Sequence, residues 1–198
     1  MGNADHHQRG QGGSFRASGL QWQWKGEKEE MSTPVAVRET KNVERIRRAE
    51  TESIDVLGIR MEWKVNERDT GRQYCLFEMT VPPGAGVPLH HHAEHEAFWV
   101  VDGEAEFGRV GSAGPEWFPI ASGDTVNVPG WAFHGFRNPG KNNVRILLLC
   151  AAGLEQFFRE VGLPALPGAA LASGPPAPSE IERVFSAGLK IPSYAYPG

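Results

Sequence analysis

Apolar and polar positions alternate in short runs between Ile54 and Ala152. In "GIRMEWKV" every second residue is apolar, a period of two that predicts a half-buried strand. Five further runs follow, separated by Gly, Pro, Asn and Asp: "QYCLFEMTV", "EAFWVV", "EAEFGRV", "DTVNVP" and "NVRILLLCA". No helical period interrupts them, and "NERDTGR" reads as a turn. Many short strands separated by turns predict an all-β fold, either a sandwich or a small closed antiparallel β-barrel.

The pattern changes after Gly153. "GLEQFFREVG" has apolar residues at helical spacing, and "SEIERVFSAG" predicts a second short C-terminal helix with Ser179 as its N-cap. A linker rich in Pro, Gly and Ala separates the two. We therefore expect a flexible N-terminal extension over residues 1–31, a β-barrel domain over 32–152, and helices and a linker over 153–198 that pack on the barrel.

Composition narrows the function classes. The chain has 198 residues, 40% of them hydrophobic and 22% charged, which is typical of a soluble globular protein. A net charge of -4 gives no basic surface for nucleic acid. No apolar run approaches the roughly 20 residues that span a bilayer, and the N-terminus lacks the apolar segment of a signal peptide, so we expect a cytoplasmic protein without a membrane partner. Cys75 and Cys150 lie inside strand-like runs and are expected to be reduced core thiols.

One short segment, "HHHAEHE", concentrates chemistry, because four of the chain's seven histidines lie within residues 90–95. Strand alternation places His90 and His92 on one side and His91 on the other. Glu96 follows a turn, and His134, in "GDTVNVPGWAFHGFRN", is the remaining histidine outside the N-terminal tail. Three neutral imidazoles and one carboxylate suit a divalent first-row metal such as Fe, Mn, Co, Ni, Cu or Zn. Each histidine alone could instead be a hydrogen-bonded core residue, and Glu96 could be a surface charge or a base beside a three-histidine metal.

The neighbouring residues are less decisive. His91 and His95 are expected either to face solvent or to contact the metal ligands without binding the metal. Glu94 is expected to be a solvent-exposed carboxylate in a turn. Trp131, at the turn before His134, is expected either to pack at the barrel rim or to contact substrate. Four apolar residues share the inward parity and would line a substrate pocket or simply fill the core: Phe77, Met79, Phe98 and Phe136.

Two spaced motifs in this region resemble those of the cupin superfamily. Gly84 to Gly103 fits G-x5-H-x-H-x3-E-x6-G without a gap. Gly123 to Asn138 fits G-x5-P-x-G-x2-H-x3-N with one departure, because Trp131 stands in the second glycine's slot. The resemblance covers about Ile54 to Ala152 and implies a jelly-roll barrel, the double-stranded β-helix, with a metal held by His90, His92, Glu96 and His134.

Within the superfamily, the chain looks like the bacterial single-domain proteins that are called quercetin dioxygenase-like. The resemblance implies a metal-dependent dioxygenase for an aromatic or enolic small molecule, with Glu96 as metal ligand or as the base that takes the substrate's hydroxyl proton. The alternatives are a cupin isomerase or epimerase, and a non-catalytic module that binds metal or ligand. Exposed strand edges favour a homodimer.

Overall fold

The computed structural model describes residues 14–17, 20–23, 43–47, 51–165, 169–172 and 174–188. The chain divides into two units, residues 1–44 and 45–198. In the first unit, strands β1 (Ser14–Ala17) and β2 (Leu20–Gln23) pair as an antiparallel hairpin. The extension expected over residues 1–31 otherwise lies outside the described residues.

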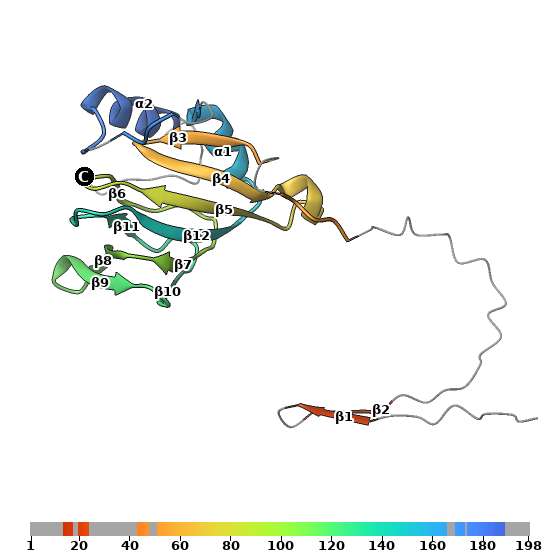
Figure 1. Ribbon diagram of the computed structural model, residues 1–198. Helices are drawn as coiled ribbons and strands as arrows, with labels where there is room; N and C mark the ends of the chain where they lie inside the picture. The colour runs from red at the N-terminus through yellow and green to blue at the C-terminus, as the bar shows by residue number, and fades with distance from the viewer. Residues whose placement is uncertain are drawn as a thin grey trace, which may run out of the picture. The chain divides into compact units, whose positions relative to one another are not determined.

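The second unit is built from two antiparallel sheets (Figure 1). The larger sheet has the strand order β10-β7-β12-β5-β4-β3-β13, and the smaller has the order β6-β11-β8-β9. The larger sheet consists of β3 (Ser53–Val56), β4 (Ile59–Val65), β5 (Tyr74–Val81), β7 (Glu96–Asp102), β10 (Thr125–Val128), β12 (Val144–Ala151) and β13 (Leu163–Pro164). The smaller consists of β6 (Gly86–His90), β8 (Glu104–Gly111), β9 (Gly114–Ala121) and β11 (His134–Arg137). Every strand pair is antiparallel, which confirms the all-β jelly-roll expectation.

Two local features differ from the sequence pattern. Strand β9 has no period of two and carries Pro115 and Pro119, yet it forms the edge of the smaller sheet. An edge strand tolerates proline because only one side of the strand needs its N–H groups for pairing. The expected turn "NERDTGR" contains a 3-10 helix, η2 (Glu67–Thr70), which ends at Gly71 with a left-handed φ of 65°.

Alternation along the strands determines which side chains enter the core. In β4 the residues Ile59, Met61 and Trp63 are buried, and the polar residues between them are only partly covered. The ring of Phe77 on β5 meets that of Trp63 edge-on, with the two centroids 5.0 Å apart. The cysteines of β5 and β12 are opposite each other as buried free thiols, with their Sγ atoms 3.2 Å apart.

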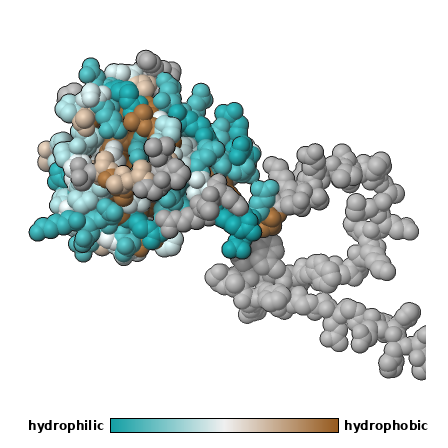
Figure 2. Space-filling model, turned by 45° about the horizontal axis from the view of Figure 1, so that its top comes forward, coloured by the Kyte–Doolittle hydropathy of each residue, from teal (hydrophilic) through white to brown (hydrophobic). Residues whose placement is uncertain are grey.

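Two helices, α1 (Leu154–Val161) and α2 (Pro178–Gly188), lie beside β3 and β4 of the larger sheet (Figure 1). Both were expected, but Ser179 is not the N-cap, because α2 already begins at Pro178. Proline is favoured at the first helical position, since its missing N–H would have no partner there in any case. Apolar side chains lie between the hydrophilic ones on the face shown in Figure 2. Neither helix in the described part of the chain is long and apolar enough to cross a membrane.

Candidate metal centre

Three histidines converge between the two sheets. His90 ends β6 and His134 begins β11, and the two residues are direct partners in the smaller sheet. His92 follows two residues after His90, and all three side chains are buried. One nitrogen from each ring lies within 4.8 Å of the others, so the three could hold a metal ion. His91 is less buried than these three, is not part of the group, and its ring lies 4.2 Å from that of Phe133.

The far nitrogens of two of these rings are tied to the backbone. Nδ1 of His90 lies 2.9 Å from the carbonyl oxygen of Pro88, and Nδ1 of His134 lies 2.9 Å from that of Ala132. A carbonyl oxygen can only accept, so each Nδ1 carries a proton, and in the neutral form of the ring Nε2 then keeps its lone pair. This tautomer is the one in which Nε2 can bind a metal, and the hydrogen bond to Nδ1 fixes the ring's orientation.

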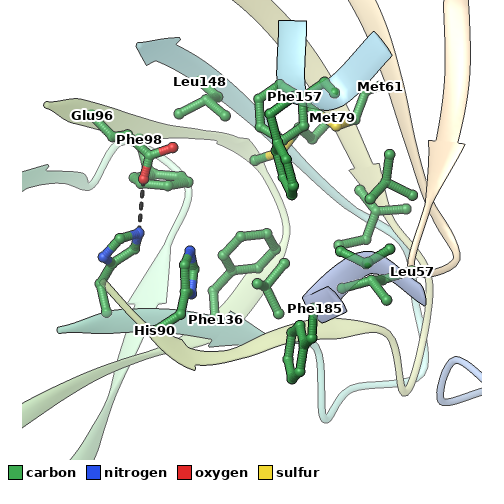
Figure 3. Close-up of a pocket in the computed structure, with 16 residues that line it drawn as sticks. Leu57, Met61, Met79, His90, Glu96, Phe98, Phe136, Leu148, Phe157 and Phe185 are labelled. Carbon is green, nitrogen blue, oxygen red and sulfur yellow. Dashed lines mark ion pairs between the residues drawn. The ribbon is translucent and has the colours of Figure 1, made fainter. Parts of the chain in front are cut away.

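Glu96 brings a carboxylate to the cluster from the opposite sheet, as the first residue of β7. Its Oε2 lies 2.8 Å from Nε2 of His134, the ion pair marked by the dashed line at Glu96 in Figure 3. The same oxygen lies 3.6 Å from Nε2 of His92. Oε2 of Glu96 and Nε2 of His134 are both buried, and within the described part of the chain neither has a hydrogen-bond partner. Buried polar atoms that converge in this way fit a shared cation, and the donor set of nitrogen and oxygen suits a first-row transition metal.

The electrostatics of the cluster also fit a cation. Burial, with the neighbouring His134, lowers the pKa of His90 to about 3, so this imidazole is neutral at physiological pH. Burial alone would raise the pKa of Glu96, but the contacts with His134 and His92 lower it to about 2. Burial likewise opposes the charge on His134, yet its contact with the Glu96 carboxylate raises the pKa above its ordinary value of 6.5. The cluster therefore presents one carboxylate and at least one neutral imidazole to an incoming metal.

Glu94 has a place that its sequence position did not indicate. Its Oε2 lies 3.3 Å from Nδ1 of His92, and its side chain is only 20% exposed. The carboxylate of Glu94 therefore lies next to Nδ1 of His92, the same ring atom that the backbone carbonyls contact in the other two histidines. His95 is exposed, as expected, and its Nδ1 accepts a hydrogen bond of 3.2 Å from the backbone of Gly130.

An apolar interior cavity of about 60 Å³ extends from the cluster toward the helices (Figure 3). His90, Glu96 and His134 lie at one end of it, and the remaining lining is apolar. Met79, Phe98 and Phe136 line this cavity, whereas Phe77 lies in the core outside the lining. The helices close its other end with apolar side chains that the strand pattern could not assign to the site: Phe157 and Phe158 from α1, and Val184 and Phe185 from α2.

A wider outer pocket of about 330 Å³ lies on another side of His134. Its walls come from β8, β9 and β10 and from the turn that precedes His134. The lining is mixed, with Phe107, Phe118 and Phe133 beside Arg109 and Asn127. His134 thus borders both the interior cavity and the outer pocket.

Comparison with known proteins places the chain as follows. Residues 77–150 match the family model of the cupin domain. No curated protein matches the sequence. Among solved structures the chain is similar to a predicted oxalate decarboxylase from Thermotoga maritima, with 21% identity, a TM-score of 0.49, and 55% of this chain and 99% of that chain covered.

Two further solved structures are similar. The polyketide cyclase RemF from Streptomyces resistomycificus has 17% identity and a TM-score of 0.49, with 56% of this chain and 80% of that chain covered. An RmlC-like cupin from Shewanella frigidimarina has 21% identity and a TM-score of 0.46, with 55% of this chain and 90% of that chain covered. The matched residues 77–150 include strands of both sheets and all four converging side chains, so it is this part of the chain that is similar to the cupin domain.

Proposed function

We propose that this protein is a metal-dependent dioxygenase that acts on an aromatic or enolic small molecule. The observation that carries the proposal is the convergence of three imidazoles and one carboxylate at the end of an apolar cavity. His90, His92, His134 and Glu96 would hold the metal. When bound, a redox-active divalent metal supplies polarisation of a substrate enol or phenol oxygen and one-electron chemistry with dioxygen.

The two cavities suggest how the reactants would be divided. One water molecule needs a cavity volume of roughly 10–15 Å³. The interior cavity, at about 60 Å³, therefore admits only a few molecules of that size. Dioxygen is small and apolar and suits this cavity, whereas a flavonol-sized body does not fit it. The outer pocket of about 330 Å³ has the space for an aromatic body. We therefore place dioxygen in the interior cavity and the organic substrate in the outer pocket, with its oxygen toward His134.

Glu96 is better suited to hold the metal than to act as a base. A general base works best when its pKa is close to the working pH. The contacts with His134 and His92 hold the pKa of Glu96 at about 2, so it is ionised but weakly basic. We therefore assign the carboxylate of Glu96 to the cation.

The lining also bears on the isomerase or epimerase alternative. A sugar's hydroxyl groups lose their water on binding and need polar partners in the site. The interior cavity offers polar atoms only at the metal cluster. The interior cavity therefore gives a sugar no polar partners away from the cluster, whereas the outer pocket has Arg109 and Asn127 beside its aromatic residues, so the isomerase or epimerase stays the second candidate.

Oxygen consumption tests the proposal directly. Protein loaded separately with Fe, Mn, Co, Ni or Cu is expected to consume dioxygen with at least one member of a panel of flavonols, catechols and small enediols. The variant His134→Ala, treated with the same metals, is expected to consume none. If no metal gives substrate-dependent uptake across the panel, the dioxygenase proposal is wrong, and conversion of sugar epimers followed by NMR then tests the isomerase.

Metal binding is expected to strengthen as the pH rises. The pKa of His134 is raised above 6.5 in the metal-free protein, so a proton must leave this ring when the metal binds. The pKa of His90, at about 3, lies too low to compete in the same range. Below the pKa of His134 the apparent affinity should fall by about tenfold per pH unit. Calorimetric titration with Co²⁺ between about pH 5.5 and 8 measures this slope, and a flat profile would contradict it.

A further inference from the structure

Trp131 is held in a backbone conformation that its side chain disfavours. Its φ is 68°, in the left-handed region. For a residue with a Cβ this region costs about 1–2 kcal/mol, and glycine occupies it freely. The position is also the one where the cupin motif has its second glycine, so the motif's glycine is explained by this conformation and the tryptophan replaces it at a cost.

The neighbouring Gly130 does not remove this cost. A Cβ at Gly130 would meet the carbonyl oxygen of Ala93, so this glycine allows the turn to approach the loop that follows His92. Its φ is not in the left-handed region. The left-handed conformation falls on Trp131 itself, whose backbone N–H donates to the carbonyl oxygen of His92 at 2.6 Å. Any residue could make this backbone hydrogen bond, so it does not explain the indole.

Burial of the indole does not offset the cost of this backbone conformation either. Its side chain is 56% exposed. Two other residues with side chains have a positive φ in the described part of the chain, and one of them, Leu57, is only 1% exposed. Burial of the Leu57 side chain therefore offsets its backbone strain. The large apolar surface of Trp131 is exposed to solvent, so burial does not offset the strain there. The other residue, Arg72, is exposed as well, so a positive φ with exposure is not by itself a sign of function; at Trp131 it coincides with a turn that borders a pocket.

Trp131 belongs to the turn that borders the outer pocket, although its own side chain is not one of the lining residues. Pro129, Ala132 and Phe133, from the same turn, line the outer pocket. The ring of His91 contacts two aromatic side chains of this turn, with its centroid 5.8 Å from that of Trp131 and 4.2 Å from that of Phe133. Phe133, which lines the outer pocket, directly precedes His134 in the chain.

We propose that Trp131 is a substrate-contacting residue whose indole stacks on the planar ring of an aromatic substrate at the entrance of the outer pocket. This inference rests on the proposed function, since it takes the outer pocket as the substrate's place. Offset stacking on an exposed indole selects planar aromatic molecules over saturated ones of the same size. The residue would thus contribute to substrate choice and not to the bond-making step.

Three substitutions separate binding from structure. Trp131→Gly removes both the ring and the strain, Trp131→Asn removes the ring and tolerates the left-handed region, and Trp131→Phe keeps a ring and the strain. Binding of 3-hydroxyflavone is followed by its fluorescence with dioxygen excluded, on full-length protein. The Gly and Asn variants should bind it about tenfold more weakly, because the stacking contact is lost. The Phe variant should stay within about threefold of the original protein, and cyclohexane-1,2-diol should bind all four proteins alike.

Thermal unfolding of the same proteins completes the test. Trp131→Gly should raise the melting temperature by about 2–4 °C, because it relieves the strain. Trp99→Phe, which changes an indole that is 52% exposed on β7, is the matched control and should change neither quantity. Unchanged flavone affinity in Trp131→Gly overturns the inference, and so does a lower melting temperature, which would give the indole a structural role. Neither result affects the oxygen-uptake test, and absent oxygen uptake leaves this binding result intact.

Discussion

Replacing His134 with alanine is expected to abolish tight metal binding and to destabilise the metal-free protein. His134 supplies one of three nitrogens that lie within 4.8 Å of one another, and its loss leaves two imidazoles and a carboxylate. Loss of even a residue behind a ligand weakens metal binding by about 10- to 100-fold, so loss of a ligand should exceed about 100-fold. Metal at about 100 times its dissociation constant should stabilise the original protein by about 2.7 kcal/mol, and this gain should vanish in His134→Ala.

The destabilisation of the metal-free variant has a separate cause. Oε2 of Glu96 lies 2.8 Å from Nε2 of His134, and both side chains are at most 5% exposed. Below the raised pKa of His134 the pair is ionic, and removal of the histidine leaves a buried carboxylate without its closest cation. Breaking a buried ion pair in this way costs about 3–5 kcal/mol. The double variant His134→Ala, Glu96→Gln should recover part of this loss, because the amide carries no charge.

Urea unfolding at pH 6, with and without Co²⁺, measures both effects. His95→Ala is the matched control, since it removes an exposed imidazole from the same loop and should retain the metal-dependent gain. Equal stabilisation by Co²⁺ in His134→Ala and in the original protein would show that the metal binds elsewhere. A metal-free His134→Ala as stable as the original would show that Glu96 does not depend on His134 for its charge.

The parts of the fold that the sequence predicted follow from periodicity. Strands β4, β5 and β12 have one face in the core, so their buried residues recur at every second position. The same alternation predicted that His90 and His92 share a side and that His91 does not. Strand β9 was missed because it is an edge strand with two prolines and only one buried residue, Ile120. Nothing in such a strand enforces a period of two.

The parts of the site that the sequence could not predict depend on contacts between distant segments. Glu94 lies outside the strands, so no alternation indicated that its carboxylate would reach His92. The side chains of Phe157 and Phe185 follow helical spacing, which predicts an apolar face but not the cavity that this face closes. The sequence alone showed that Trp131 replaces a glycine of the second motif. The structure adds that this position has a left-handed φ, which a residue with a side chain disfavours. Motif spacing therefore identified the converging residues, and only the packed structure defined what surrounds them.

Asn138 should be the polar side chain on which the barrel's stability depends most. It is 1% exposed, and its side chain satisfies three backbone groups. Nδ2 donates to the carbonyl oxygens of Val81 and Asn142, both at 2.8 Å, and Oδ1 accepts from the N–H of Gly140 at 2.9 Å. One side chain thus joins the end of β5 to the loop that leads into β12.

The variant Asn138→Ala is expected to lose about 3–4 kcal/mol of the free energy of unfolding, because each buried backbone group left unsatisfied costs about 1–3 kcal/mol. Asn138→Asp should be similarly destabilised at neutral pH, since a carboxylate cannot donate to the two carbonyl oxygens and would repel them. Asn142→Ala keeps its backbone carbonyl and changes only an exposed residue, so it should stay within about 0.5 kcal/mol of the original. Urea unfolding followed by tryptophan fluorescence gives the three values. A loss below about 1 kcal/mol in Asn138→Ala would mean that water enters and satisfies these groups, and that the asparagine is not what joins the two segments.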